Sequence, residues 1–231
     1  MLLIDSYGQE IDFTIPEQYT KLAVNCSGGA DSSILLYMVA KYLKDNNRTN
    51  TTLSVLTCAN DFKHRWNARK AADIINYVID ELEWNQFDMH YAYYRDVQDT
   101  EYFHEVEEKL FSDNRVDLII NGITSNPTVP GPVFIEDSSG NMVDILETGL
   151  DDRNTGGIAP TLEHGKWYMP FVNVDKRFVA AMYEQNNVMD MFDMTRSCEA
   201  IPNGKYKENF EFESCGACWW CLERKWAFGR C

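Results

Sequence analysis

The chain reads Ser27-Gly28-Gly29-Ala30-Asp31-Ser32-Ser33 directly after the apolar run Leu22–Cys26 and directly before a helical pattern that begins at Ile34. A short strand that turns on two glycines into a helix is a typical anion-binding arrangement. Glycines let backbone N–H groups approach an anion closely, and the helix dipole favours negative charge at the helix N-terminus. The hydroxyls of Ser32 and Ser33 fall in the first turn, where they can cap the helix or contact a phosphate oxygen. The stretch therefore predicts a phosphate-binding loop, and an ordinary capped turn is the alternative.

Strand and helix patterns alternate outward from this loop. They predict strands at 22–26, 51–58, 87–94 and 116–122, and helices at 32–44, 63–80 and 99–111. Such alternation is typical of a Rossmann-like α/β fold, in which a twisted parallel sheet carries helices on both faces. In these sheets, ligands bind beyond the carboxyl ends of the strands. The loop 27–33 and the segment Gly122–Pro127 both lie at that edge, so we expect them to face each other across one crevice.

The stretch 128–166 differs in character from what precedes it, because prolines, glycines and acidic residues replace the alternating pattern. A long, mostly irregular stretch is usually a functional lid, so we interpret it as a flap over the crevice, with surface decoration as the alternative. Regular structure is expected again at Trp167–Phe171 and in a helix at about 175–186. The predicted organisation is an α/β domain over 1–190 and a small C-terminal region over 191–231.

Composition limits the function classes open to the chain. It has 231 residues and a formal net charge of −15, which argues against a polynucleotide partner, because nucleic-acid binding depends on Lys and Arg neutralising phosphates. No stretch approaches the roughly 20 apolar residues of a membrane span, so no membrane partner is expected. The N-terminus lacks the basic segment of a signal peptide, so a cytoplasmic location is expected. The oligomeric state stays open, with a homodimer as one arrangement.

Five of the seven cysteines lie in the last 34 residues. Cys215, Cys218 and Cys221 have two consecutive C-x-x-C spacings, and Cys198 supplies a fourth thiol. Four thiolates are the ligands of a closed tetrahedral zinc site, so zinc is the expected ion. The same spacing also occurs in iron–sulfur ligation, which stays open as an alternative. A redox dithiol fits poorly because it needs only two thiols, and Cys231 is expected to be a free thiol outside the set.

Two segments carry a resemblance to known families. The string 27–33 is similar to the SGGxDSS loop of the PP-loop ATP pyrophosphatases, and it lacks the lysine of a Walker-type loop. The segments Thr195–Cys198 and Cys215–Cys221, followed by Arg224 and Ala227-Phe228, resemble the C-terminal signature of the QueC family, the 7-cyano-7-deazaguanine (preQ0) synthases. Pro170 and Lys176 resemble the family's segment just upstream of that signature.

The resemblance implies an enzyme that uses ATP and Mg²⁺ to adenylate the carboxylate of 7-carboxy-7-deazaguanine. Ammonia then gives the amide, and further ATP gives the nitrile. The residues from Ser27 to Ser33 would hold the pyrophosphate of ATP, and Asp31 would orient the metal ion or its waters. Lys176 would act as a mobile cation that neutralises developing phosphate charge, with a solvated lysine at a helix start as the alternative.

One segment departs from the family pattern. Family members carry acidic and aromatic residues for the substrate after the fourth strand, whereas this chain has Gly122, Thr124 and Ser125 there. These three residues are the candidates for contacting the acceptor, whose identity the departure leaves open. Two alternatives remain: a PP-loop enzyme of sulfur transfer (tRNA thiolation or sulfonucleotide reduction), and a non-catalytic nucleotide-binding module held by zinc.

Overall fold

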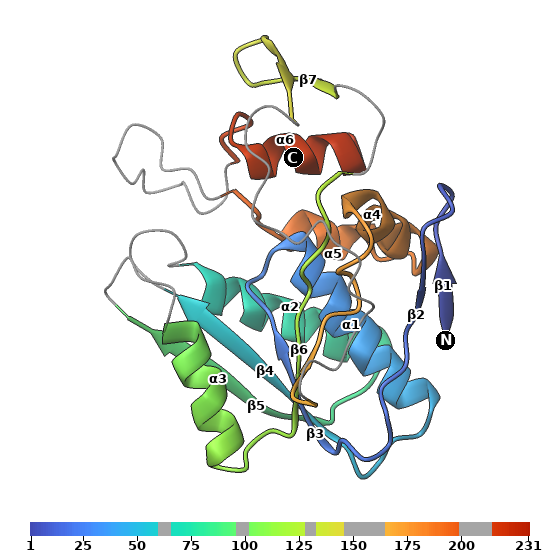
Figure 1. Ribbon diagram of the computed structural model, residues 1–231, viewed down its shortest axis with the longest axis vertical. Helices are drawn as coiled ribbons and strands as arrows, with labels where there is room; N and C mark the ends of the chain where they lie inside the picture. The colour runs from blue at the N-terminus through green and yellow to red at the C-terminus, as the bar shows by residue number, and fades with distance from the viewer. Residues whose placement is uncertain (60–65, 96–101, 128–132, 146–164, 199–213) are drawn as a thin grey trace.

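Five parallel strands form the central sheet of the protein (Figure 1). The computed structural model describes residues 1–59, 66–95, 102–127, 133–145, 165–198 and 214–231. The strands are β3 (Lys21–Asn25), β4 (Thr52–Ala59), β5 (Phe87–Tyr94), β6 (Leu118–Ile120) and β9 (Trp167–Tyr168). Their order across the sheet is β5-β4-β3-β6-β9, and every neighbouring pair is parallel. The strand order therefore reverses direction between β3 and β6, and such a switch point is where parallel sheets bind ligands.

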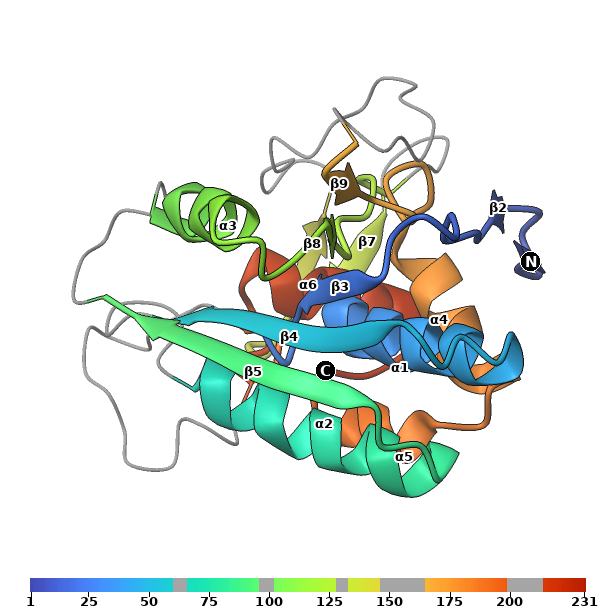
Figure 2. The ribbon, with the colours of Figure 1, turned by 90° about the horizontal axis from the view of Figure 1, so that it is seen from below.

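Helices cover both faces of this sheet, as the sequence predicted (Figure 2). One face packs on α1 (Ala30–Asp45), α2 (Asn67–Leu82), α4 (Lys176–Gln185) and α5 (Met189–Met194), and the other face packs on α3 (Tyr102–Ser112). Successive strand side chains point to opposite faces. Accordingly Leu22 and Val24 join the core cluster with α1, whereas Ala23 joins the cluster with Leu110 of α3. Both faces are apolar, which explains why the strands read as continuous hydrophobic runs.

The observed elements follow the predicted ranges closely at β3, β4 and β5. The predicted helix starts at 63–65 and 99–101 lie outside the described residues, and the observed helices begin at Asn67 and Tyr102. β6 is shorter than predicted and ends at Ile120, before Asn121 and Gly122. None of the helices in the described part of the chain is both long and apolar enough to cross a membrane.

The structure adds elements that the sequence patterns did not predict. They are the helix α5, the hairpin β1 (Leu2–Ile4) with β2 (Glu10–Asp12), the hairpin β7 (Phe134–Glu136) with β8 (Met142–Asp144), and the helix α6 (Trp219–Phe228). The β7–β8 hairpin replaces irregular structure expected in the flap, whose other parts at 128–132 and 146–164 lie outside the described residues. Lys225 on α6 donates to the carbonyl of Glu136 at 2.7 Å, so this hairpin packs on the C-terminal helix.

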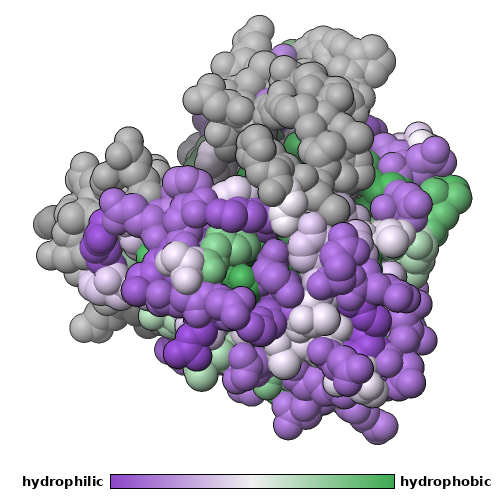
Figure 3. Space-filling model, turned by 60° about the horizontal axis from the view of Figure 1, so that its bottom comes forward, coloured by the Kyte–Doolittle hydropathy of each residue, from purple (hydrophilic) through white to green (hydrophobic). Residues whose placement is uncertain are grey.

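The described surface is largely hydrophilic on the face shown in Figure 3. This agrees with a chain in which a quarter of the residues are charged. Some apolar side chains are exposed as well, among them Leu2 and Ile4 of the N-terminal hairpin. Scattered exposed apolar residues are normal on a soluble surface.

Candidate active site

The predicted phosphate loop adopts a conformation that only glycine accommodates at one position. Gly28 has φ +75°, and a Cβ placed there would stand 2.3 Å from the Cβ of Lys70 on α2. Gly29 is extended (φ −80°, ψ 164°) and is the N-cap of α1. Because Gly29 has no side chain, the N-cap residue itself does not compete with a ligand for the first N–H groups of the helix. The loop therefore has the close backbone approach and the helix N-terminus that an anion site requires.

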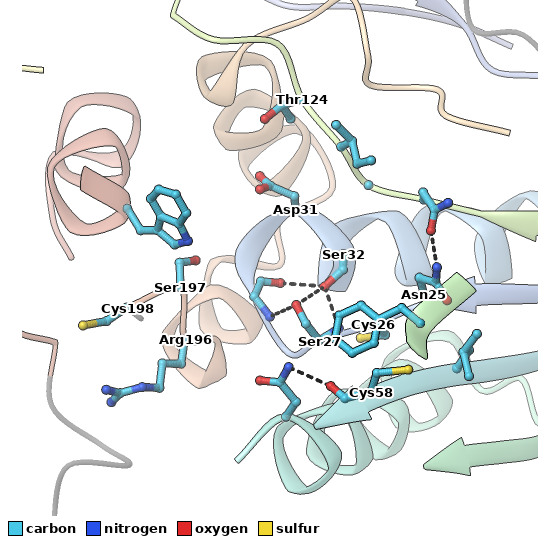
Figure 4. Close-up of a pocket in the computed structure, with 18 of the residues that line it drawn as sticks. Asn25, Cys26, Ser27, Asp31, Ser32, Cys58, Thr124, Arg196, Ser197 and Cys198 are labelled. Carbon is cyan, nitrogen blue, oxygen red and sulfur yellow. Dashed lines mark hydrogen bonds between the residues drawn. The ribbon is translucent and has the colours of Figure 1, made fainter. Parts of the chain in front are cut away.

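The serines of the loop divide into two groups. Ser32 Oγ donates to the carbonyl of Gly29 at 3.3 Å and accepts from the backbone N–H of Ser27 at 3.2 Å, which closes the loop on itself (Figure 4). Ser27 and Ser32 both line a cavity at this edge of the sheet. Ser33 is fully buried, and its hydroxyl has no hydrogen-bond partner among the described residues. The next helical position turns Ser33 inward, so the predicted phosphate contact is available to Ser32 and not to Ser33.

The cavity has a volume of about 520 Å³ and lies beyond the carboxyl ends of β3, β4 and β6. The two segments expected to face each other do meet there, because a Cβ on Gly122 would lie 3.2 Å from the backbone of Asp31. Thr124 also lines the cavity. Ser125 is not among the lining residues, since its backbone N–H pairs with the carbonyl of Val174 and its side chain is buried. Gly122 and Thr124 are thus placed to contact a ligand, and Ser125 is not.

Lys176 is held in the cavity by two carboxylates. Its ammonium lies 2.5 Å from Asp31 Oδ2 and 3.4 Å from Glu223 Oε2 of α6. The side chains of Lys176 and Glu223 are only 6% and 2% exposed, respectively. This burial excludes a solvated lysine, and the two ion pairs fix the cation that the sequence interpretation took to be mobile. No sequence pattern distinguished Glu223, which reaches the site only through tertiary packing.

The N-terminus of α4 is braced by a second buried carboxylate. Asp175 caps the helix by accepting from the backbone N–H of Arg177 at 2.9 Å, and it also accepts from Gln9 at 3.0 Å. The guanidinium of Arg177 lies 2.7 Å from the same carboxylate. Burial acts to raise the pKa of Asp175, but these hydrogen bonds outweigh it and hold the pKa below its usual value of 3.8. The cap therefore stays ionised and positions Lys176, the next residue.

The segment after α5 lies on the phosphate loop. The backbone N–H of Arg196 donates to the carbonyl of Gly28 at 2.8 Å, and that of Ala30 donates to Ser197 Oγ at 3.4 Å. The Arg196 guanidinium stacks on the ring of Trp66, 4.3 Å from its centroid, and burial lowers the pKa of this arginine. Arg196 and Ser197 both line the cavity. Sequence reasoning placed them in a family signature and did not expect them at the nucleotide loop.

The four predicted metal ligands lie together. The sulfur atoms of Cys198, Cys215, Cys218 and Cys221 are all within 4.8 Å of one another. The N–H groups of Cys218 and Cys215 donate to the sulfurs of Cys215 and Cys198, at 3.2 and 3.4 Å. The hydrogen bond to Cys198, followed by burial, raises the pKa of Cys218 to about 12. Thiolates at this spacing therefore need a bound cation to be stable, and the donor set fits a metal site.

Two further features of this region follow from its backbone and its packing. Gly216 has φ +69°, and a Cβ there would come within 2.8 Å of Ser138 Cβ, so the tight turn between two ligands requires glycine. Cys231 is not a member of the set, since its thiol contacts the carbonyl of Cys221. Cys198 lines the cavity together with Trp219 and Trp220, so the cysteine cluster and the cavity share a border.

Sequence reasoning also missed a set of polar side chains on the opposite side of the cavity. Asn25 and Asn121 follow the buried runs of β3 and β6, and Asn25 donates to both Asn121 Oδ1 and Glu107 Oε1. Polar residues where buried strands end are a signal that could have found the two asparagines. Glu107 comes from α3, where an exposed acidic residue is unremarkable, so nothing in the sequence distinguished it. We name Asn25, Glu107 and Asn121 the polar wall.

The chain has only distant similarity to known proteins. No family model matches the chain, and no curated protein matches it. Among solved structures, it is similar to the U34-tRNA thiolase NcsA from Methanococcus maripaludis with its [4Fe-4S] cluster, at 12% identity and a TM-score of 0.45, over 83% of this chain and 62% of the thiolase. It is also similar to NMN synthetase from Francisella tularensis, at 12% identity and a TM-score of 0.41, over 92% of this chain and 79% of that enzyme.

This chain thus spans less than two thirds of the thiolase. Identities of 12% and TM-scores below 0.5 are too low to transfer a function or a cofactor. The function is therefore inferred from the residues of the cavity.

Proposed function

We propose that the protein is an ATP-dependent ligase that adenylates a 7-carboxy-7-deazaguanine-type carboxylate and uses ammonia to form the amide or the nitrile. The observation that carries the proposal is the ion pair of the buried Lys176 with Asp31 at the N-terminus of α1, in the same cavity as the loop 27–33 and the segment 121–124. A cation at a glycine-turned helix N-terminus suits a polyphosphate, and the open remainder of the cavity leaves room for an acceptor.

The chemistry follows from the arrangement. A carboxylate oxygen of the acceptor attacks the α-phosphorus of ATP, the bond between that phosphorus and the bridging oxygen breaks, and the electron pair leaves with pyrophosphate. Negative charge then grows on the leaving group, where the Lys176 ammonium and the backbone N–H groups of Asp31 and Ser32 in the first turn of α1 stabilise it. Ammonia next attacks the acyl carbon, and AMP leaves with the electron pair of the C–O bond. The extra proton on nitrogen passes to solvent.

The residues also fit a Mg²⁺ ion. Lys176, Asp31 and Glu223 together carry one net negative charge, which by itself would repel a triphosphate. Asp31 Oδ1 is buried and has no hydrogen-bond partner among the described residues, which leaves a hard oxygen ligand available. When bound, Mg²⁺ would be held by Asp31 and would supply positive charge that offsets the charge of the phosphates. Asp31 is therefore assigned to orient the ion, and Lys176 to meet the phosphate charge directly.

Zinc is the ion we propose for the four cysteines. A tetrahedral ion with Zn–S bonds of about 2.3 Å separates its sulfurs by about 3.8 Å. The sulfurs of Cys215 and Cys221, and those of Cys198 and Cys218, are 3.9 Å apart. In an iron–sulfur cluster the thiolates bind different iron atoms and stand farther apart, so the spacing favours a single ion. The site supplies structural support, since it anchors the segment that lies on the phosphate loop.

Sulfur transfer is less well supported by the two cavity cysteines that lie outside the four-cysteine set. Cys26 and Cys58 line it, and burial raises the pKa of both thiols, that of Cys58 to about 12. The thiolate is the reactive form of cysteine, so neither is activated for nucleophilic attack.

The test is an incubation of the protein with Mg-ATP, ammonia and 7-carboxy-7-deazaguanine, followed by mass spectrometry of nucleotides and bases. AMP and an amide or nitrile are expected. The variant Asp31→Asn removes the predicted magnesium ligand and should lose AMP formation. Asp45→Asn at the other end of the same helix, where Asp45 pairs with Lys41 on the surface, is the matched control and should keep it. AMP without amide or nitrile would reject the acceptor, and no AMP with any candidate acceptor would reject the ligase.

A further inference from the structure

The polar wall places a carboxylate among neutral partners in the cavity. Glu107 lines the cavity, and its side chain is 12% exposed. Its Oε1 accepts from Asn25 Nδ2 at 2.6 Å, and its Oε2 accepts from the indole N–H of Trp167 at 3.1 Å. Its ion-pair partner is His104, whose Nδ1 is 3.9 Å away on a largely exposed ring. Among the described residues, no lysine or arginine forms an ion pair with Glu107.

Two of the four lone-pair positions of Glu107 are therefore used, and the remainder can accept from a ligand. Asn25 donates to Asn121 as well, so the Oδ1 of Asn121 is occupied as an acceptor. What Asn121 retains for a ligand is its NH₂ group, a donor. The wall thus offers acceptors on Glu107 and a donor on Asn121, side by side at the switch point between β3 and β6.

The aromatic neighbour of the wall suits a flat ligand. Phe103 lies one helical turn before Glu107 on α3 and lines the same cavity. Residues four apart share one face of a helix, so the ring and the carboxylate are adjacent. An aromatic face beside a row of hydrogen-bonding groups is how proteins hold planar heterocycles.

We propose that the polar wall recognises the aminopyrimidinone edge of the acceptor heterocycle. Glu107 accepts from two neighbouring donors, a ring N–H and an exocyclic amino group, while Asn121 donates to the ring carbonyl. This inference rests on the proposed function and adds to it a specificity-determining residue. A donor–donor–acceptor edge matches the wall, whereas the adenine of ATP, which offers one amino donor beside a ring acceptor, matches it poorly.

The test compares two probes, 7-carboxy-7-deazaguanine and its analogue without the 2-amino group, by calorimetric titration of the full chain. The wild-type protein should bind the first about ten- to a hundredfold more tightly, the value of a hydrogen bond to a charged group. Glu107→Gln replaces one acceptor by a donor and should remove most of this preference, with thermal unfolding as the check on folding. Glu108→Gln is the matched control, because Glu108 is the next residue and pairs with Lys166 on the surface.

The outcomes separate this inference from the proposed function. If the wild type binds the two probes equally, or if Glu107→Gln keeps the full preference, the wall does not read this edge, although the ligase proposal stands. If Glu107→Gln weakens the binding of ATP and leaves the affinity for both probes unchanged, the polar wall binds adenine and the inference fails. If neither probe binds while ATP does, the acceptor class and the inference both fail, and the adenylating half of the proposal remains.

Discussion

Replacing Gly28 by alanine should destabilise the protein and impair its nucleotide site. Two separate effects add at this position. A residue with a Cβ pays about 1–2 kcal/mol to adopt a left-handed backbone conformation, and Gly28 has φ +75°. The new Cβ would also lie 2.3 Å from Lys70 Cβ and 3.2 Å from the Lys70 carbonyl carbon, well inside the contact distance of about 3.5–4.0 Å. Overpacking of this kind costs about 1–3 kcal/mol, so the sum is about 2–5 kcal/mol.

Gly8→Ala is the matched control. Gly8 has φ +81°, and a Cβ there meets nothing within 4 Å, so this variant carries the backbone cost without the steric one. Urea unfolding followed by tryptophan fluorescence should give a loss of about 1–2 kcal/mol for Gly8→Ala and a clearly larger loss for Gly28→Ala. Only Gly28→Ala should weaken the binding of ATP in calorimetric titration, by about tenfold or more. The reason is that this substitution moves the N–H groups that face the phosphates.

Two outcomes for this pair of variants would contradict the prediction. If Gly28→Ala costs no more than Gly8→Ala, the loop does not lie against α2 as the structure has it. If Gly28→Ala is destabilised as expected but binds ATP like the wild type, the loop is a structural turn and not the pyrophosphate site.

Three further predictions concern the residues around the loop. Cys218→Ser should lose the bound metal in elemental analysis and lower the melting temperature, and a variant that keeps one zinc per chain would contradict the ligand set. Glu223→Gln should reduce AMP formation, because Lys176 would move toward Asp31 alone; unchanged kinetics would make this carboxylate dispensable. The pKa of Asp175 is below 3.8 in the folded protein, so near this pH the unfolded chain binds more protons than the folded one. The free energy of unfolding therefore rises as the pH rises through this range. The free energy of unfolding should therefore fall as pH drops below about 4, and Asp175→Asn should reduce that dependence in urea titrations between pH 3 and 6.

The sequence predicted the parts of the site that depend on local backbone rules. The loop 27–33 was recognisable because two glycines between a strand and a helix have a steric reason to be there, and Gly122 followed from the end of a buried strand. The C-x-x-C spacings likewise act over a few residues. Such patterns depend on neighbouring residues alone, and the structure brings the loop and Gly122 together as expected.

The missed residues share a different cause. Glu223 and Arg224 are charged residues on the buried side of α6. Because apolar residues are expected at buried helix positions, these two charges hide the pattern by which the helix could have been predicted. Glu107 resembles any exposed acidic residue of a helix until Trp167 and Asn25 are placed against it. Lys176 was identified, but its burial between two carboxylates depends on α1 and α6 meeting in space. Polar groups whose partners are distant in sequence leave no periodic pattern to read.

The contacts of the C-terminal region support the proposal that this region completes the nucleotide site. The predicted boundary at residue 190 separates two segments in sequence, yet Glu223 pairs with Lys176 across it, and Arg196 hydrogen-bonds the carbonyl of Gly28. Cys198 is two residues from Arg196, so a metal that fixes this cysteine also limits the movement of the segment on the phosphate loop. Metal binding and nucleotide binding should then be linked, because each orders the same short stretch of backbone and either ligand lowers the cost of ordering it for the other.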